Sequence, residues 1–542
     1  MGHKIFEKVP IQVPNKSGFD ISHYHLASLK CGQLVPVFTK LMLPNDKISV
    51  GISSRANLPP LATDFYGELQ LRYEAFFVPL RTVFGGWQSV FTHGEDSSYP
   101  NDEQPTKRLP RVLYNANSTG TTEWNASAAE IGPTTLSDYL GIKIDRDAWN
   151  ENGFFNILPH LCYHKIWDDW YRNSLIQRSC FQRPSIVFGQ SNTLQAYRAG
   201  NLPYVSPVHG DGPQSDMYYG KMLADGVSVL STRQRNWDND YFTTATTSPQ
   251  AGDEIKVEVD ADSTFSVMSL FSANALQKWL IRNNYAGGRY QDQIFARFGC
   301  MPSDAVTNRA LYLGQHTDNI YSRSVFKQSS EAAAGSQNPF DSVGAKYGSA
   351  SSFGDGSIID EFEANEHGYI MIIASIVPQR NYASGTHRSF SYEYITDMPD
   401  SLLQQVGDQE IYNSELTGGS TGLGEASGTF AYAQRFAEHK FMFNQCSGLL
   451  RDGQSLQSFA LQQSFDAATM PIMSTSFLEI PQSYLDDVAA VRGDISTYGA
   501  WLEIGFNAQL VSTLSPYTIA TLGDPYDHHV ELIDKHGRNL SR

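Results

Sequence analysis

The feature that most constrains this chain is a series of short, β-prone segments separated by long polar connections rich in glycine and proline. The segment 69–78 begins with strict apolar–polar alternation and ends at Pro79, which has no N–H to donate to a strand ladder. The run 369–377 is apolar on both faces, which is typical of a strand buried in a sandwich. Further strands are expected at 34–38, 47–53, 254–259, 389–395 and 501–511.

Helices are expected to be few. The clearest covers 158–176, with Pro159 in its first turn, where a missing N–H costs little. Ser272 is expected to cap a second helix that runs through 284, with Trp279 on its apolar side, and a third helix is expected at 290–298. Because strands from both ends of the chain must pair, an antiparallel Greek-key sandwich is favoured over sequential βαβ units.

Several connections are longer than those of most compact domains. Tyrosine and phenylalanine punctuate most of them, so we interpret them as surface or intersubunit insertions, with simple disorder as the alternative. They cover residues 101–132, 187–236, 329–356 and 417–428, and a possible tail covers 530–542.

Composition and charge limit the partners of the chain. Charged residues make up 18% of the sequence, below the roughly 25% of typical globular proteins, and aromatic residues make up 12%. The aromatic content fits an interface-forming surface and a large aromatic core equally well. The net charge of −17 gives no attraction for phosphate over the whole surface, so enclosing DNA would need local basic groups, cations or a small basic partner.

The cysteines and the first residues indicate a cytoplasmic, soluble product. The five cysteines are odd in number and widely spaced, and no C-x-x-C pair is present, so free thiols are expected. The first residues lack the apolar stretch of a secretory signal. The longest apolar run, 369–377, is far shorter than the ~20 residues of a membrane helix.

Motifs for catalysis are weak. His160 and His164 have the i, i+4 spacing of metal pairs, but Leu161 stands where zinc proteases have glutamate, so packing is favoured. The adjacent carboxylates at 168–169 and 486–487 point to different faces of a helix and do not make an acid–base couple. A cupin-like cluster of His23, His25, His528 and His529 would require the fold to bring them together. We therefore predict a protein that is not an enzyme, with no catalytic, cofactor or metal site.

A series of short motifs runs in a fixed order along residues 17–400. They are S-x-F-D-x-S-H at 17–23, G-x-L-x-P at 32–36, V-P-x-R at 78–81, I-W-D-D-W-Y-R at 166–172, D-Y-F-T at 240–243, G-G-R-Y at 287–290 and E-H-G-Y at 366–369. Each motif alone is weak, but their common order resembles that of the major capsid proteins of the Microviridae, in particular the gokushovirus branch.

The resemblance implies a single eight-stranded antiparallel jelly-roll sandwich of the viral capsid type, forming one domain over 1–542. It also implies a T=1 icosahedral shell of sixty copies in the virion, around circular single-stranded DNA and assembled in the cytoplasm of a bacterial host. Expected partners are the DNA, a small basic DNA-binding protein, a minor (pilot) virion protein and a host-cell surface receptor, with no membrane insertion. Gokushovirus proteins carry a long insertion after the P-Q-x-G segment, whereas here only about 251–270 follows it.

Two expectations concern ligands. Lys535, Arg538 and Arg542 lie in the possible tail and are candidate nucleic-acid contacts, although such charges are more often simply solvated. The alternative function is a carbohydrate-binding or hydrolytic jelly-roll protein, which would stack sugars on aromatic rings and would remain small instead of forming particles.

Overall fold

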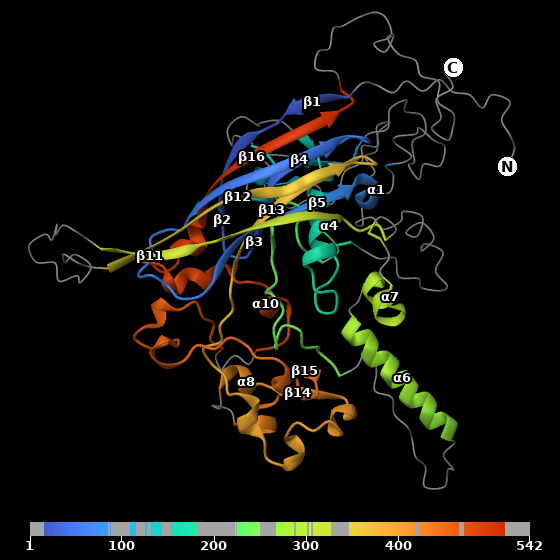
Figure 1. The fold of residues 1–542 in the computed structure, drawn as a ribbon, viewed down its shortest axis with the longest axis vertical. Coiled ribbons are helices and arrows are strands. Elements are labelled where there is room, and N and C mark those ends of the chain that lie inside the picture. Colours follow the sequence, from blue (N-terminus) through green and yellow to red (C-terminus); the bar gives the residue numbers. More distant parts are fainter. Residues whose placement is uncertain are drawn as a thin grey trace, which may run out of the picture.

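The computed structural model describes residues 16–84, 87, 109–114, 125–126, 132–143, 153–181, 223, 225–249, 267–286, 289–300, 303–304, 307–326, 346–418, 422–465 and 471–514. Among these residues, strands dominate, nearly all of them pair antiparallel, and most helices are short (Figure 1). The prediction of a mainly β protein with antiparallel sheets and few helices is confirmed.

The first sheet has six strands and brings together segments from the two ends of the sequence. They are β1 (Ser17–Asp20), β2 (His23–Leu29), β4 (Lys47–Asn57), β11 (Tyr321–Phe326), β12 (Lys346–Glu363) and β16 (Ala500–Ser512). The order is β1–β16–β4–β12–β11, and β2 also pairs with β16 (Figure 1). Asn57 of β4 lies opposite Trp501 of β16, so this pairing is strongly non-local.

The second sheet has five strands. They are β3 (Gln33–Met42), β5 (Leu69–Pro79), β9 (Arg233–Gln234), β10 (Leu311–Asn319) and β13 (Gly368–Pro378). The order is β10–β5–β13–β3–β9, which places the most apolar segment of the sequence in the middle strand.

The two sheets face each other across the largest apolar core. In β13, Ile370 and Ile372 belong to this core, whereas Met371 and Ile373 belong to a second core on the other side of the sheet. This alternation explains why β13 is apolar on both faces. At one edge, β10 of the second sheet contacts β12 of the first.

The second core lies between the five-stranded sheet and a helical layer. α4 (Leu158–Ile166) continues into the single π-helical turn η1 (Trp167–Tyr171), and both pack with α1 (Leu80–Val83) and α3 (Leu136–Tyr139). Tyr171 of η1 joins this layer to the sheet, because its Oη donates to Glu74 Oε2 of β5, which also lies 2.5 Å from Arg235 Nη1 in a buried ion pair. A small sheet beside it contains β6 (Arg111–Tyr114), β7 (Asn125–Ala126) and β8 (Gly153–Asn156).

A third region, at the end of the molecule away from β1, has its own core around Phe242, Phe430 and Phe477 (Figure 1). Its sheet pairs β14 (Asp408–Tyr412) with β15 (Thr429–Gln434). Short helices surround it or connect it to the sandwich: η3 (Arg388–Ser391), η4 (Ile395–Asp397), η5 (Leu403–Val406), α8 (Ser414–Thr417), η6 (Gly424–Ser427), α9 (Ala437–Lys440), η7 (Gly448–Leu450), η8 (Gln457–Phe459), α10 (Thr475–Leu478), η9 (Gln482–Val488) and α11 (Asp494–Tyr498).

Five expected strands are confirmed as β3, β4, β5, β13 and β16. The strand expected at 389–395 is wrong, because this stretch forms η3 and begins η4. Here Arg388 and Tyr392 bond inward to side chains of the third region instead of joining a ladder.

The prediction of a connection over 329–356 is wrong from residue 346 onward, because β12 begins there. Small residues are needed in this part of β12 because other segments of the same chain lie close to it. A Cβ at Gly348, for example, would overlap the backbone oxygen of Thr63. Within the expected insertion 187–236, residues 233–234 form β9 and pair with β3.

The helices differ from expectation mainly at their ends. The helix expected at 158–176 ends at Tyr171. The helix expected to start at Ser272 is α6 (Val267–Ala286), which begins earlier, so Ser272 is not its cap. The third helix is confirmed as α7 (Tyr290–Phe298).

Some expectations lie outside the described residues. These are the strand at 254–259, the tail 530–542 with Lys535, Arg538 and Arg542, the pair His528 and His529, residues 329–345, and most of the insertions 101–132 and 187–236.

Candidate functional site

The histidine pair of α4 is packed in the second core. His160 Nε2 lies 3.0 Å from Ser137 Oγ, and His164 Nε2 lies 2.9 Å from the Val229 carbonyl. Burial lowers the pKa of His160 to about 3 and the pKa of His164 well below its usual value. His164 Nδ1 accepts from Arg233 Nε at 3.0 Å, so this nitrogen is not open to a metal ion. The packing interpretation of the pair is therefore supported.

The adjacent carboxylates have separate partners. Asp168 pairs with Arg172 at 2.7 Å, whereas Asp169 pairs with Lys165 at 2.9 Å and accepts from the Ala310 amide. Both carboxylates therefore have structural roles. Arg172, a basic side chain beside aromatic rings of the kind that can bind nucleic acid, is engaged in one of these ion pairs. No group of three or more metal-ligating side chains is found in the described part of the chain.

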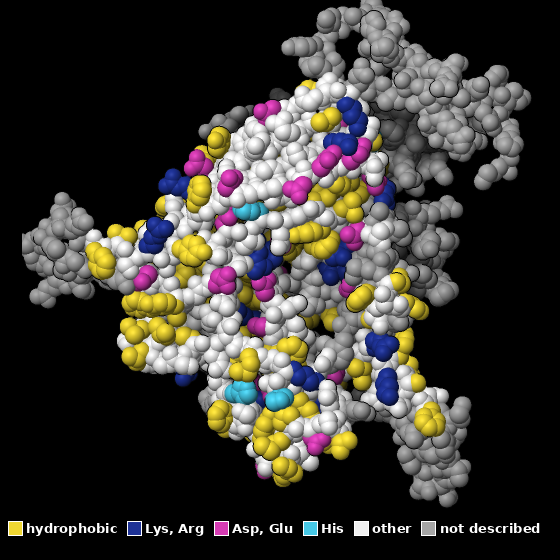
Figure 2. Space-filling view, in the orientation of Figure 1, with side chains coloured by type: hydrophobic (Ala, Val, Ile, Leu, Met, Phe, Trp, Pro, Cys, Tyr) yellow, Lys and Arg dark blue, Asp and Glu magenta, His cyan; other side chains and the backbone are white. Residues whose placement is uncertain are grey.

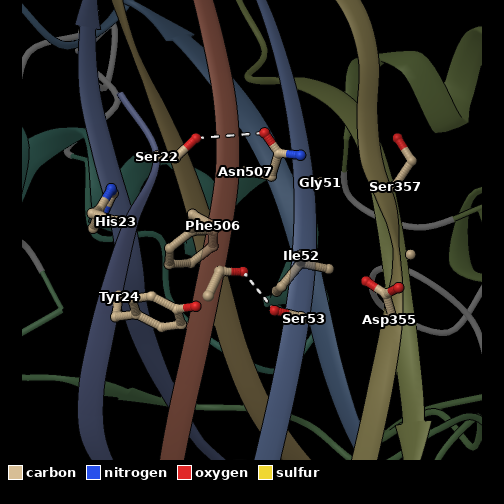
Figure 3. A pocket seen from close by; sticks show the side chains of 12 residues that line it. Ser22, His23, Tyr24, Gly51, Ile52, Ser53, Asp355, Ser357, Phe506 and Asn507 are labelled. Atoms are coloured by element: carbon tan, nitrogen blue, oxygen red, sulfur yellow. Dashed lines mark hydrogen bonds between the residues drawn. The ribbon is translucent and has the colours of Figure 1, made fainter. Parts of the chain in front are cut away.

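A groove of about 490 Å³ crosses the outer face of the first sheet (Figure 3). Gly51, Gly505, Tyr24, Asn507 and Asp355 are among the residues that line it. Asp355 is the one carboxylate among the lining residues, so the groove does not contain a carboxylate pair for hydrolysis. His23 also lines it, but its ring packs against Phe506 at 5.3 Å.

The described surface carries many large apolar side chains, and Figure 2 shows them gathered in several places on one face. Single exposed apolar residues are ordinary, but contiguous groups mark association surfaces. The groups lie along the first sheet, on α6 and α7, and in the third region. Those more than 60% exposed are Tyr24, Leu26, Tyr66, Phe271, Phe298, Tyr321, Phe353, Phe390, Tyr394, Ile395, Leu402, Met442, Ile472 and Tyr498.

This surface is the candidate functional site. Sequence reasoning left the aromatic content open between an interface-forming surface and an aromatic core, and it placed the intersubunit contacts in the long connections. The structure adds exposed apolar groups on regular elements such as α6 and β12. The apolar side of α6 was visible in the sequence, but its exposure was not.

Together, the β-sandwich and its exposed apolar surface define a structural subunit suited to association with copies of itself. No helix in the described part of the chain is long and apolar enough to cross a bilayer.

Comparison with known proteins identifies the family. A family model described as "Capsid protein (F protein)" matches residues 8–522, so this chain belongs to that capsid protein family. The chain is 23% identical to capsid protein VP1 of Chlamydia phage 1, over 88% of this chain and 91% of the relative. It is 22% identical to capsid protein VP1 of Bdellovibrio phage phiMH2K, over 88% and 90%. For capsid protein VP1 of Spiroplasma virus 4 the identity is 21%, over 91% and 92%.

These matches confirm the resemblance to the Microviridae and the prediction of a major capsid protein of the virion. Assembly with copies of itself into a capsid follows from membership of the family.

Proposed function

We propose that this chain builds a closed T=1 icosahedral shell of sixty copies around circular single-stranded DNA, and that its role is structural and not catalytic. The order of strands in the two sheets is the observation that carries the proposal. When β2, β3, β4, β5, β10, β12, β13 and β16 are lettered B to I, the first sheet reads B–I–D–G and the second reads C–H–E–F.

This is the order of an eight-stranded jelly roll, the architecture of many viral capsid subunits. It supports one capsid domain over 1–542, in which β1, β9 and β11 extend the sheets. Residues 80–310, between β5 and β10, then form the largest excursion from the jelly roll, and the third region forms another. On this proposal 101–132, 187–232, 329–345 and 417–428 are surface or intersubunit insertions.

The packaged genome requires basic groups that the chain lacks in bulk. With a net charge of −17, the shell needs local positive charge to hold DNA. We propose Lys535, Arg538 and Arg542 in the tail 530–542 as one source and a small basic virion protein as another. A minor virion protein and a host-cell receptor complete the expected partners. Deleting 530–542 should reduce DNA content or particle yield, and full particles of normal yield would remove the tail from this role.

Assembly state tests the main proposal. Expressed with its phage partners, the protein should sediment as particles and appear in electron micrographs as closed shells of one size. The alternative function, a carbohydrate-binding or hydrolytic jelly-roll protein, would give small species that bind or cleave glycans. A homogeneous small species under all conditions would refute the shell.

A further inference from the structure

Helix α6 is exposed on most sides between residues 271 and 282, where it combines apolar and basic side chains. Phe271, Ala275, Lys278 and Arg282 recur at helical spacing, and Trp279 lies beside them. All five are exposed; Phe271 is 63% exposed and Trp279 47%. We call these five residues the α6 stripe. The helix has no acidic residue, and Lys278 and Arg282 are its only charged residues.

The α6 stripe is held on a fixed support. The main contact of α6 within the described structure is with α7. Arg289, which precedes α7, donates from Nη2 to the carbonyls of Asp168 and Arg172, at 2.8 and 2.7 Å. These bonds attach the helical pair to the end of η1. A 20-residue helix is about 30 Å long, and such helices depend mainly on packing of an apolar face for their stability.

The third region carries a complementary surface at residues 390–402. Phe390, Ile395 and Leu402 are 75%, 81% and 83% exposed. Glu393 and Asp400 are also exposed, and 390–402 contains three acidic residues and no basic residue. We call this segment the 390–402 surface.

Inward-pointing neighbours fix the shape of the 390–402 surface. Arg388 Nη1 lies 3.1 Å from Glu415 Oε1, and these side chains are only 12% and 2% exposed. Tyr392 Oη donates to Glu438 at 2.9 Å. The Asp397 carboxylate accepts from the amides of residues 393 and 394, which lowers its pKa and keeps it ionised. A surface held in this way loses little conformational entropy on binding.

We propose that the α6 stripe of one subunit docks on the 390–402 surface of a neighbouring copy. This inference rests on the proposed function, since a shell requires copies of the chain to bind each other. The match is apolar against apolar, with Lys278 and Arg282 against Glu393 and Asp400, whereas Asp397 lies near Arg388 and Arg435 of its own subunit. Because the two surfaces differ, the contact is heterologous and repeats head to tail until a ring closes.

Charge reversal tests the docking directly. Lys278→Glu/Arg282→Glu and Glu393→Lys/Asp400→Lys should each lower particle yield about tenfold, because like charges then face each other across a repeated contact. Combining all four changes should restore the yield to near the wild-type level. Lys143→Glu/Arg178→Glu is the matched control, since both side chains are exposed, neither lies in the first sheet, α6, α7 or the third region, and the change in net charge is the same.

The inference is overturned if the fourfold variant assembles no better than either pair, or if the control loses as much. The Lys278→Glu/Arg282→Glu particles could instead be intact but lack DNA, with no rescue by Glu393→Lys/Asp400→Lys. That result would assign the α6 stripe to nucleic-acid binding.

Cross-linking separates this contact from assembly in general. In a Cys300→Ser background, which removes the exposed thiol, Ala275→Cys and Ile395→Cys together should give a ladder of disulfide-linked multimers after oxidation of particles. Either cysteine alone should stop at dimers. Normal particles without a ladder would refute the docking but not the proposed shell. Failure of the wild-type chain to form particles would refute the proposed function itself.

Discussion

Substitution of Gly314 by alanine tests whether contact between β10 and β12 closes one edge of the sandwich. A Cβ at Gly314 would lie closer than 3.0 Å to the backbone oxygen of Ile358, a separation that real Cβ atoms essentially never show. Ile358 is buried, and a backbone oxygen cannot swing aside as the end of a side chain can. Strands β10 and β12 must therefore move apart at this point, which opens the core between the sheets.

Overpacking of this kind costs about 1–3 kcal/mol. Chemical denaturation of unassembled subunits, followed by tryptophan fluorescence, should show a lower midpoint with little change in slope. Gly51→Ala is the matched control, because its Cβ would meet ordinary contacts at 3.7 Å and the glycine has no positive φ. Its stability should stay within about 1 kcal/mol of the wild type. A Gly314→Ala protein as stable as the wild type, or a control equally destabilised, would show that this reasoning is wrong.

Other predictions concern the buried groups of the sandwich. Arg235→Met should destabilise the subunit by about 3–5 kcal/mol, because the Glu74 carboxylate is left buried without its cation, and adding Glu74→Gln should recover part of the loss in the same denaturation assay. Ile372→Ala, at a fully buried position of β13, should cost about 2–5 kcal/mol, and a melt unchanged from wild type would contradict its place in the core. In thiol titration of native subunits, Cys300 should react first and Cys162 only after unfolding, because burial raises the pKa of the Cys162 thiol and blocks access.

The parts of the fold that the sequence predicts are those with a strong local pattern. The run 369–377 identifies β13, because a strand covered on both faces must be apolar throughout. The serine- and glycine-rich start of β12 carries no such signal, since its small residues are required by the close approach of neighbours such as Thr63. Local patterns also do not predict which strands pair, because nothing in the sequence around Trp501 indicates that Asn57 lies opposite it.

The candidate site was predicted in kind but not in place. The resemblance of the ordered motifs to capsid proteins predicted a self-associating subunit, and membership of a capsid family confirms the family, whereas aromatic content fitted an interface and a core equally well. The apolar side of α6 was expected from periodicity. The same periodicity, however, occurs in a helix whose apolar side is buried in its own subunit and in a helix whose apolar side is exposed. Only exposure distinguishes them, as for Phe271 and Trp279, and exposure depends on the tertiary structure.

The position of β16 between β4 and β2 has a consequence for biosynthesis. Asn57 leaves the ribosome roughly 440 positions before its partner Trp501, a delay of about 20–90 s at typical translation rates. During that interval the first sheet lacks a middle strand, and the nascent chain offers its neighbours only an incomplete surface. The first sheet can therefore be completed only after almost the whole chain has been synthesised.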